Sequence, residues 1–391
     1  MNILIVGADY YSQIGGKTTH ILMLKKGLEE AGHSVGVIFP YRNLFTKLLI
    51  GGVGKILDLF NIGIIYRQFI IKNILKCLIS KYCKTKEIDV INAEDIVAFF
   101  SIFEMKKKVP IALTVHGELA QEMESAGHIK GSFERNHFLK MEKKAYESAD
   151  CVVAVDTRLK NHVEKLALAA EQKLSVIQNF MDVKSFQKEI DSLDKKKIRR
   201  ELKIDTGRKL ILVPRRLVLK CGIIYAVKAS EILKKKYNRN NFLFLIVGDG
   251  PEKDNLNNYI QTKNLQGDVV LKGSVEYKEM VKFYKMADIV LVPSINVKGY
   301  IEATSLSVLE AMSAQVPVIA SNIGGLAEII ENKKTGILTP EKSSEHIAES
   351  ILKLSDNENF RTEIVGNASN YVLKNHSYLD AAQVFIDLYK K

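Results

Sequence analysis

Short apolar runs alternate with longer amphipathic segments along nearly the whole chain. The runs are rich in Val, Ile and Leu, which is typical of buried strands. In the first half of the chain they occur at 2–7, 34–39, 89–92, 111–115, 151–155 and 174–177. Segments between them have helical spacing, for example 18–31, which ends at Gly32, and 133–148. This strand–helix alternation predicts a parallel, doubly wound α/β sheet.

A second series of apolar runs follows a polar, lysine-rich stretch at 184–209. These runs lie at 210–214, 242–247, 269–271, 289–292 and 316–320. The length of 391 residues fits two or three domains. We therefore expect two Rossmann-like domains that face each other across a cleft, at 1–187 and 188–371. A C-terminal helix at about 372–391 either stays with the second domain or packs back on the first.

Two carboxylates eight positions apart, Glu302 and Glu310, lie at a predicted helix start in GYIEATSLSVLE. Thr304 or Ser305 can cap this helix. The first N–H groups of a helix lack intrahelical acceptors and, with the helix dipole, attract phosphate. The two carboxylates are thus placed to bracket a pyrophosphate and to accept hydroxyl groups of a sugar and a ribose. In the alternative interpretation, Glu310 completes a capping box with Ser307, and Glu302 is a solvated loop charge.

Each predicted domain also carries groups suited to phosphate where a parallel sheet would bind it. Gly15 and Gly16 precede a helix in the first domain, and Arg216 and Lys220 follow the first strand of the second. Two cations four residues apart can neutralise a diphosphate. Each feature also has an ordinary explanation, a tight turn for the glycines and a solvated strand end for the basic residues. Neither Gly15-Gly16 nor the turn at Gly248 completes G-x-G-x-x-G, which argues against NAD.

The cysteines and the N-terminus indicate a reducing compartment. Cys77, Cys83, Cys151 and Cys221 are scattered without the paired spacing of metal ligands. The chain starts directly with a predicted strand and shows no signal peptide. No cluster of Asp, His or Cys in the sequence indicates a metal site. We expect a cytoplasmic protein that needs no metal ion or other cofactor.

The formal net charge of +12 is concentrated in one segment. Nine basic residues and one acid between 41 and 86 give this segment +8. The segment is also strongly apolar, and Arg67, Lys72 and Lys76 form a narrow polar stripe on a helical projection. It is either a basic amphipathic element that binds an anionic membrane surface, or a helix packed on the core with a solvated basic edge. No uncharged run is long enough to span a bilayer, and no motif supports nucleic acid as a partner.

Several motifs occur in the order and spacing of a known enzyme family. In the first half they are the Gly15-Gly16 turn with 28–35, TVHGE at 114–118 and VIQNFMD at 176–182. In the second half they are 216–218, 247–251, the E-x7-E pair Glu302 and Glu310, and 317–320 followed by Gly324, Gly325 and Glu328. Together these motifs resemble glycosyltransferase family 4, whose members are retaining enzymes of the GT-B fold. The resemblance spans nearly the whole chain.

The resemblance implies roles for particular residues. Glu302 would hold hydroxyls of the donor sugar, Glu310 would hold the ribose, and His116 would lie across the cleft near the sugar. Arg216 and Lys220 would neutralise the leaving diphosphate. The expected catalytic residues are His116, Glu302, Arg216 and Lys220, and the expected donor-binding residues are Gly15, Gly16, Gly248, Thr304, Ser305, Leu306 and Glu310.

Three positions depart from the family pattern. Cys221 stands between Lys220 and Gly222, where the family has Lys directly before Gly, so Lys220 is an approximate equivalent. Phe180 replaces a linker Gly, and Gln315 replaces a Gly before a strand. The fold prediction does not depend on these positions.

The sequence therefore predicts a retaining glycosyltransferase of the hexosyltransferase type. It would move a sugar from a nucleoside-diphosphate sugar to a saccharide or lipid-linked acceptor of the cell envelope. We expect it in the cytoplasm, peripheral on the inner face of the cell membrane through 41–86. The alternatives are a GT-B sugar-nucleotide epimerase or hydrolase, which needs no acceptor surface, and a non-enzymatic membrane-attached scaffold.

Overall fold

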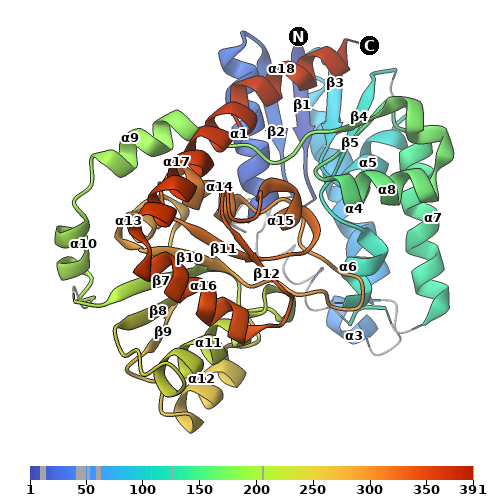
Figure 1. The fold of residues 1–391 in the computed structure, drawn as a ribbon. Helices are drawn as coiled ribbons and strands as arrows, with labels where there is room; N and C mark the ends of the chain where they lie inside the picture. The colour runs from blue at the N-terminus through green and yellow to red at the C-terminus, as the bar shows by residue number, and fades with distance from the viewer. Residues whose placement is uncertain are drawn as a thin grey trace. The chain divides into compact units, whose positions relative to one another are not determined.

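The computed structural model divides the chain into two compact units (Figure 1). It describes residues 1–8, 15–40, 50, 53–58, 63–106, 108–125, 127–129, 131–204 and 207–390. The first unit comprises Met1–Asn179 together with Tyr378–Lys391, and the second comprises Phe180–Ser377. A boundary near residue 188 would fall inside helix α9, Val183–Asp191. The final helix, α18, belongs to the first unit.

The first unit is built on a six-stranded parallel sheet in the order β2-β1-β3-β4-β5-β6. Its strands are β1 (Asn2–Val6), β2 (Ser34–Ile38), β3 (Val90–Ala93), β4 (Ile111–Val115), β5 (Cys151–Ala154) and β6 (Leu174–Val176). Its helices are α1 (Gly16–Glu30), α3 (Gly54–Asp58), α4 (Gly63–Tyr82), α5 (Ile96–Phe103), α6 (Leu119–Ser125), α7 (Ser132–Ser148), α8 (Thr157–Leu166), the 3-10 helix η2 (Leu168–Lys173) and α18 (Tyr378–Tyr389). α18 packs on α1, whereas α4, α5, α7 and α8 form a row of packed neighbours.

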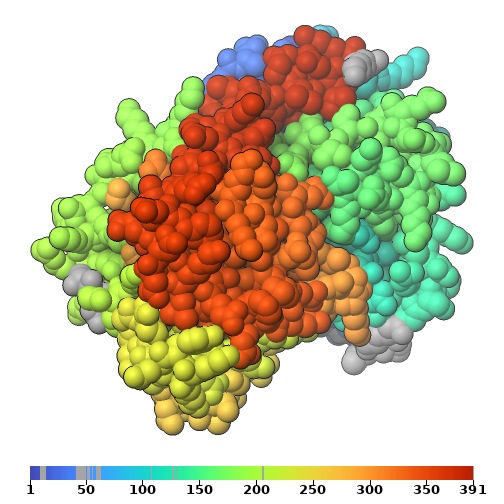
Figure 2. Space-filling model, in the orientation of Figure 1, coloured from blue at the N-terminus to red at the C-terminus, as the bar shows by residue number. Residues whose placement is uncertain are grey.

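The second unit has its own six-stranded parallel sheet, in the order β12-β11-β10-β7-β8-β9. Its strands are β7 (Lys209–Pro214), β8 (Phe242–Val247), β9 (Val269–Gly273), β10 (Ile289–Val292), β11 (Val318–Ser321) and β12 (Ile337–Thr339). Its helices are α9, α10 (Lys195–Glu201), η3 (Leu219–Cys221), α11 (Ile223–Lys235), α12 (Lys253–Thr262), η4 (Tyr277–Glu279), α13 (Met280–Met286), α14 (Leu306–Ser313), α15 (Gly324–Ile329), α16 (Ser344–Asp356) and α17 (Glu358–Asn375). In Figure 2 the orange-red atoms of α16 and α17 form an unbroken part of this unit's surface.

Burial on both faces explains why the strands are apolar throughout. Leu210 and Leu212 of β7 point into one core cluster, whereas Ile211 and Val213 point into another. Alternate residues of a strand face opposite sides of its sheet, so both sides of β7 are covered. Every residue of β8 is buried as well. The two clusters hold the sheet between helical layers and fix the positions of its strand ends.

The strand orders also predict where ligands bind. In each sheet the direction in which successive strands are added reverses beside the first strand, between β1 and β3 in the first unit and between β7 and β10 in the second. Open parallel sheets bind ligands at the carboxyl ends of strands next to such a reversal. Among the described helices, none is both long enough and apolar enough to cross a membrane.

Candidate functional site

A buried ion pair lies at the carboxyl ends of β7 and β10. Arg215 directly follows β7, and its guanidinium lies 2.7 Å from Oε2 of Glu302. The same guanidinium donates to Oγ of Ser294, just after β10, at 3.1 Å and to Oγ of Ser305 at 3.2 Å. The side chains of Arg215 and Glu302 are only 9% and 13% exposed. Arg215 therefore joins two strand ends to the loop that contains Glu302.

Lys220 completes a group of two cations around this carboxylate. Its Nζ lies 3.7 Å from Oε2 of Glu302 and 4.0 Å from the centre of the Tyr300 ring. Burial alone would raise the pKa of Glu302, but Arg215 and Lys220 lower it to about 2. Glu302 is therefore ionised at neutral pH and keeps the negative charge that both cations require.

Two glycines hold the main chain behind this group. Gly324 has φ +47°, and a Cβ there would lie 2.2 Å from the carbonyl oxygen of Glu302. Gly248 has φ +150°, and a Cβ there would lie 2.1 Å from the carbonyl oxygen of Arg215. Only glycine fits both the torsion and the space at these positions. Gly248, expected to bind the donor, is thus placed directly behind Arg215.

The structure separates the roles of the two neighbouring arginines. Arg216, selected from the sequence, is exposed, and the described residues give it no ion pair. Its charge still contributes to lowering the pKa of Glu302. Arg215, which the sequence analysis did not select, makes the direct contact. Consecutive basic residues at a strand end give no sequence signal for which of them points inward.

Helix α14 presents its N-terminus beside the same group. Ser305 occupies the N-cap position, but its side chain makes no capping bond and accepts from Arg215 instead. Helical bonding starts at the N–H of Val308, so the N–H groups of Ser305, Leu306 and Ser307 have no intrahelical acceptor. Thr304 and Ser305 are only 4% and 3% exposed. These donors and the helix dipole suit an anion.

Glu310 lies one turn further along α14 and is bonded to tyrosines, not to Ser307. Tyr284 donates to its Oε2 at 2.6 Å, and Tyr277 also bonds it. Ser307 bonds the carbonyl of Pro214, so the capping-box interpretation is wrong. Burial raises the pKa of Glu310 to about 7, although the tyrosine hydrogen bonds oppose this shift.

A second polar cluster lies in the first unit, after β3 and β4. His116 Nε2 lies 2.7 Å from Oε2 of Glu94, which is fully buried. Asn92 donates to the other Glu94 oxygen at 2.7 Å, and Thr114 donates to Asn92 at 3.2 Å. The rings of His116 and His20 are stacked edge to face, with their centres 4.7 Å apart. His116 is therefore held by residues from two other segments, Glu94 after β3 and His20 of α1.

The protonation of this cluster changes near neutral pH. Burial raises the pKa of Glu94 to about 7, against the opposing effects of His20 and Lys17. Burial lowers the pKa of His20 to about 4. Glu94 therefore titrates near neutral pH while it contacts Nε2 of His116.

The same three residues also form the one group of potential metal ligands found among the described residues. Candidate ligand atoms of His20, Glu94 and His116 all lie within 4.8 Å of one another. Two imidazoles and a carboxylate suit divalent transition metals. No motif in the sequence indicates this group, because its members are far apart along the chain. The expectation that no metal is needed remains a prediction.

The Gly15-Gly16 turn lies at the start of α1. Gly15 is its N-cap, Gly16 is its first residue, and both are exposed. Asp95 bonds the backbone N–H of Ala8 at 2.8 Å and Lys17 Nζ at 3.1 Å. Asp95 thereby holds the start of α1 to the segment after β1. Gly15 and Gly16 themselves lie at the surface of the unit.

Comparisons with known proteins identify the family. The pattern described as "Glycosyltransferase Family 4" matches residues 14–185, and "Glycosyl transferases group 1" matches residues 194–371. The chain belongs to glycosyltransferase family 4. The predictions of the family and of a glycosyltransferase activity are confirmed, and members of this family take nucleotide-sugar donors.

Relatives and solved structures match over the full chain. An uncharacterized glycosyltransferase of Methanocaldococcus jannaschii is 28% identical over 100% of this chain and 98% of its own. An alpha-monoglucosyldiacylglycerol synthase of Streptococcus pneumoniae is 22% identical over 98% of this chain and 89% of its own. Sucrose-phosphate synthase from Thermosynechococcus elongatus has a TM-score of 0.78 at 17% identity, covering 100% and 98% of the two chains. Anabaena HepE in complex with UDP and glucose has a TM-score of 0.72 at 17% identity, covering 100% of both chains. These structures confirm the predicted GT-B fold with two parallel sheets.

The two arginines lead to opposite predictions for stability and binding. Arg215→Ala leaves Glu302 buried without its main partner and should lower the free energy of unfolding by about 3–5 kcal/mol. Arg216→Ala should leave stability unchanged, because the Arg216 side chain is exposed. It should weaken nucleoside-diphosphate binding roughly tenfold, because it removes a guanidinium that is available to phosphate in the wild type. Urea denaturation and titration calorimetry measure the two effects, and Arg216→Lys serves as a charge-conserving control. Equal destabilisation by both alanine variants would contradict this division of roles.

Glu310 should make nucleotide affinity pH-dependent. Ribose hydroxyls donate to an ionised carboxylate, so binding below pH 7 releases a proton and affinity rises with pH. With a pKa of about 7, affinity should rise roughly 30-fold between pH 5.5 and 8 and then level off. Glu310→Gln should remove this increase, and it also controls for titration of the nucleotide phosphate. An identical pH profile in wild type and Glu310→Gln would remove Glu310 from the ribose site.

Proposed function

We propose that this enzyme transfers a sugar, with retention, from a nucleoside-diphosphate sugar to a saccharide or lipid-linked acceptor at a membrane surface. The observation that carries the proposal is the arrangement of Arg215, Lys220 and Glu302 beside the N-terminus of α14. It combines fixed cations, N–H groups without intrahelical acceptors and an ionised carboxylate at the carboxyl end of a parallel sheet. HepE, which shares the fold, binds UDP and glucose.

The donor assignment follows from the charge that develops during the reaction. Departure of the diphosphate places negative charge on phosphate and oxocarbenium character on the sugar. Lys220, Arg216 and the N–H groups at Ser305 and Leu306 stabilise the first charge without reorganisation. Glu302, held by Arg215, accepts sugar hydroxyls, so we assign it no role as a covalent nucleophile.

Glu310 and the glycines provide the remaining donor contacts in this proposal. Glu310 accepts the ribose hydroxyls, while Gly15 and Gly16 let the backbone approach the phosphates. His116 acts on the reacting sugar and is held in place by Glu94. The cations of the donor site perform the task that a metal ion has in other transferases, so the reaction proceeds without one.

The basic segment at 41–86 supports a membrane-associated acceptor and a peripheral position on the inner face of the cell membrane. Lys47 lies outside the described residues, and only the backbone of Lys55 is described. In α4, Lys72 and Lys76 both bond Glu104, while Phe69 is 55% exposed. An exposed apolar side chain close to basic residues on one helix is typical of interfacial binding. The similar synthase of Streptococcus pneumoniae is named for a diacylglycerol product.

His116→Ala should lower turnover by about 10²–10⁴-fold with little change in donor affinity, because its proposed role is in the transition state. Steady-state kinetics and nucleotide titration separate the two quantities, and His128→Ala is an exposed histidine control in the same unit. We expect activity to persist in EDTA. Wild-type turnover in His116→Ala would remove His116 from the mechanism, and loss of activity in EDTA with recovery on adding zinc would assign the His20–Glu94–His116 group to a metal.

The acceptor is tested with UDP-, GDP- and ADP-sugars offered together with lipid-linked or soluble saccharides. Nucleoside-diphosphate release should require the lipid-linked acceptor, and the correct nucleotide should stabilise the protein by about 2.7 kcal/mol at 100 times its Kd.

Replacing Lys47, Lys55, Lys72 and Lys76 by Gln should weaken binding to anionic vesicles but not to nucleotide. The charge-matched control replaces Lys165, Lys184, Lys188 and Lys196. Release without any acceptor would favour a hydrolase, and transfer only to soluble acceptors would exclude the membrane-bound acceptor.

A further inference from the structure

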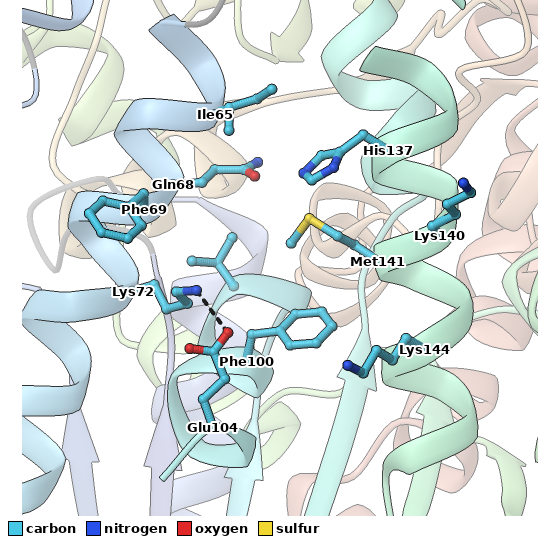
Figure 3. A pocket seen from close by; sticks show the side chains of 11 residues that line it. Ile65, Gln68, Phe69, Lys72, Phe100, Glu104, His137, Lys140, Met141 and Lys144 are labelled. Carbon is cyan, nitrogen blue, oxygen red and sulfur yellow. Dashed lines mark hydrogen bonds and ion pairs between the residues drawn. The ribbon is translucent and has the colours of Figure 1, made fainter. Parts of the chain in front are cut away.

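A cavity of about 440 Å³ lies among α4, α5 and α7 of the first unit (Figure 3). Figure 3 shows Gln68 and Lys72 of α4 and His137 and Met141 of α7 pointing into the space between the two helices, with Phe100 of α5 beneath. The volume is within the range of pockets that enclose small organic ligands. No residue of the proposed donor site lines it.

The walls of this α4–α7 pocket are single helical faces. Ile65, Gln68, Phe69 and Lys72 are spaced three or four residues apart on α4, as are His137, Lys140, Met141 and Lys144 on α7. The floor consists of Val97 and Phe100, which are 9% and 7% exposed. Ile65, Phe69 and Met141 extend this apolar surface along the walls, whereas Gln68, Lys72 and His137 add polar groups to them.

The rim carries excess positive charge. Glu104 is the one acid among the lining residues, and it is shared by Lys72, at 2.8 Å, and Lys76. Lys140 and Lys144 are exposed, and the described part of the chain offers neither of them a carboxylate within ion-pair distance. A ligand that complements this pocket has an apolar body and an anionic head.

Large apolar side chains are exposed on α4 and on its neighbour α3. Phe69 is 55% exposed on α4, and Ile56 is 61% exposed on α3, which packs against α4. Arg67 of α4 is bonded to Asp58 of α3, which holds the two helices together. Exposed large hydrophobic groups near cations are typical of contact with a lipid bilayer.

We propose that the α4–α7 pocket receives one acyl chain of an anionic phospholipid from a membrane, with the lipid phosphate at Lys140 and Lys144. The apolar floor and the apolar side chains of the walls contact the chain, and the lysine stems follow it outward to the charged surface. This inference rests on the proposed membrane association but not on the donor site. It adds α7 as a second cationic element beyond the 41–86 segment.

The chain contains no Trp, so one substitution gives a unique fluorescent reporter. Phe69→Trp places the reporter at the pocket, and Leu379→Trp places a control on α18, where Leu379 is 44% exposed. The vesicles contain phosphatidylglycerol and phosphatidylcholine with acyl chains brominated along their length. These chains should quench the fluorescence of the Phe69→Trp variant at low salt, whereas the fluorescence of the Leu379→Trp variant should not change. Vesicles of phosphatidylcholine alone should quench neither variant.

Two further variants separate the pocket from general charge attraction. Lys140→Gln with Lys144→Gln should weaken vesicle binding roughly 30-fold, whereas Lys25→Gln with Lys26→Gln on α1 removes the same charge and should have little effect. Gln68→Glu, nearly isosteric, should reduce quenching of the pocket reporter when combined with Phe69→Trp, because it places a carboxylate in the pocket. Thermal unfolding and nucleotide binding show whether each variant is folded.

Each outcome decides the proposal. Vesicle binding without quenching of the pocket reporter would mean that charge alone attracts the protein and would overturn it. Quenching by a monomeric brominated fatty acid without vesicle binding would assign the pocket to a soluble amphiphile, and would also overturn it. Failure of nucleotide binding or transfer with quenching of the pocket reporter intact would refute the proposed donor site but leave the pocket assignment standing.

Discussion

The contact between Arg215 and Glu302 organises the candidate donor site. Both side chains are about nine-tenths buried, and removing ions from water carries a desolvation penalty that geometry must offset. The offset comes from Lys220 and from the hydroxyls of Ser294 and Ser305. Because the groups involved lie at the ends of β7 and β10, on η3 and at the start of α14, the ion pair depends on the correct placement of all four elements.

Burial acts on three carboxyl groups in this protein with different results. Glu302 has two cations close by and its pKa is about 2, whereas Glu310 and Glu94 have mainly neutral partners or histidines and their pKa values are about 7. Desolvation disfavours the ionised form of all three carboxyl groups. Glu302 nevertheless stays ionised at neutral pH because two cations lie beside it, whereas Glu310 and Glu94 titrate near neutral pH. Groups that titrate near neutral pH in buried polar clusters are typical of functional sites.

The strands were the most predictable part of the fold, because burial on both faces leaves few polar residues within them. The predicted runs match eleven strands to within about two residues, and β12, Ile337–Thr339, was missed. The helix start at Ser305 was predicted from its local pattern. Contacts between distant segments, such as His20 with His116, leave no periodic signal and could not be found. The choice between Arg215 and Arg216 depended on side-chain direction, which adjacent identical residues do not reveal.

The return of α18 to the first unit has a consequence for synthesis of the protein. Gly27 of α1 approaches α18 so closely that an added Cβ would lie 2.7 Å from Cβ of Ala382, and Tyr378 bonds Glu30 at 2.7 Å. The second unit is one continuous stretch of chain and can fold as it leaves the ribosome, whereas α1 must wait for α18 until the second unit has been translated. During that interval the face of α1 that α18 covers stays open to chaperones and proteases. A ribosome stalled within the second unit would thus leave a nascent chain whose C-terminal portion is folding while its N-terminal portion is still incomplete.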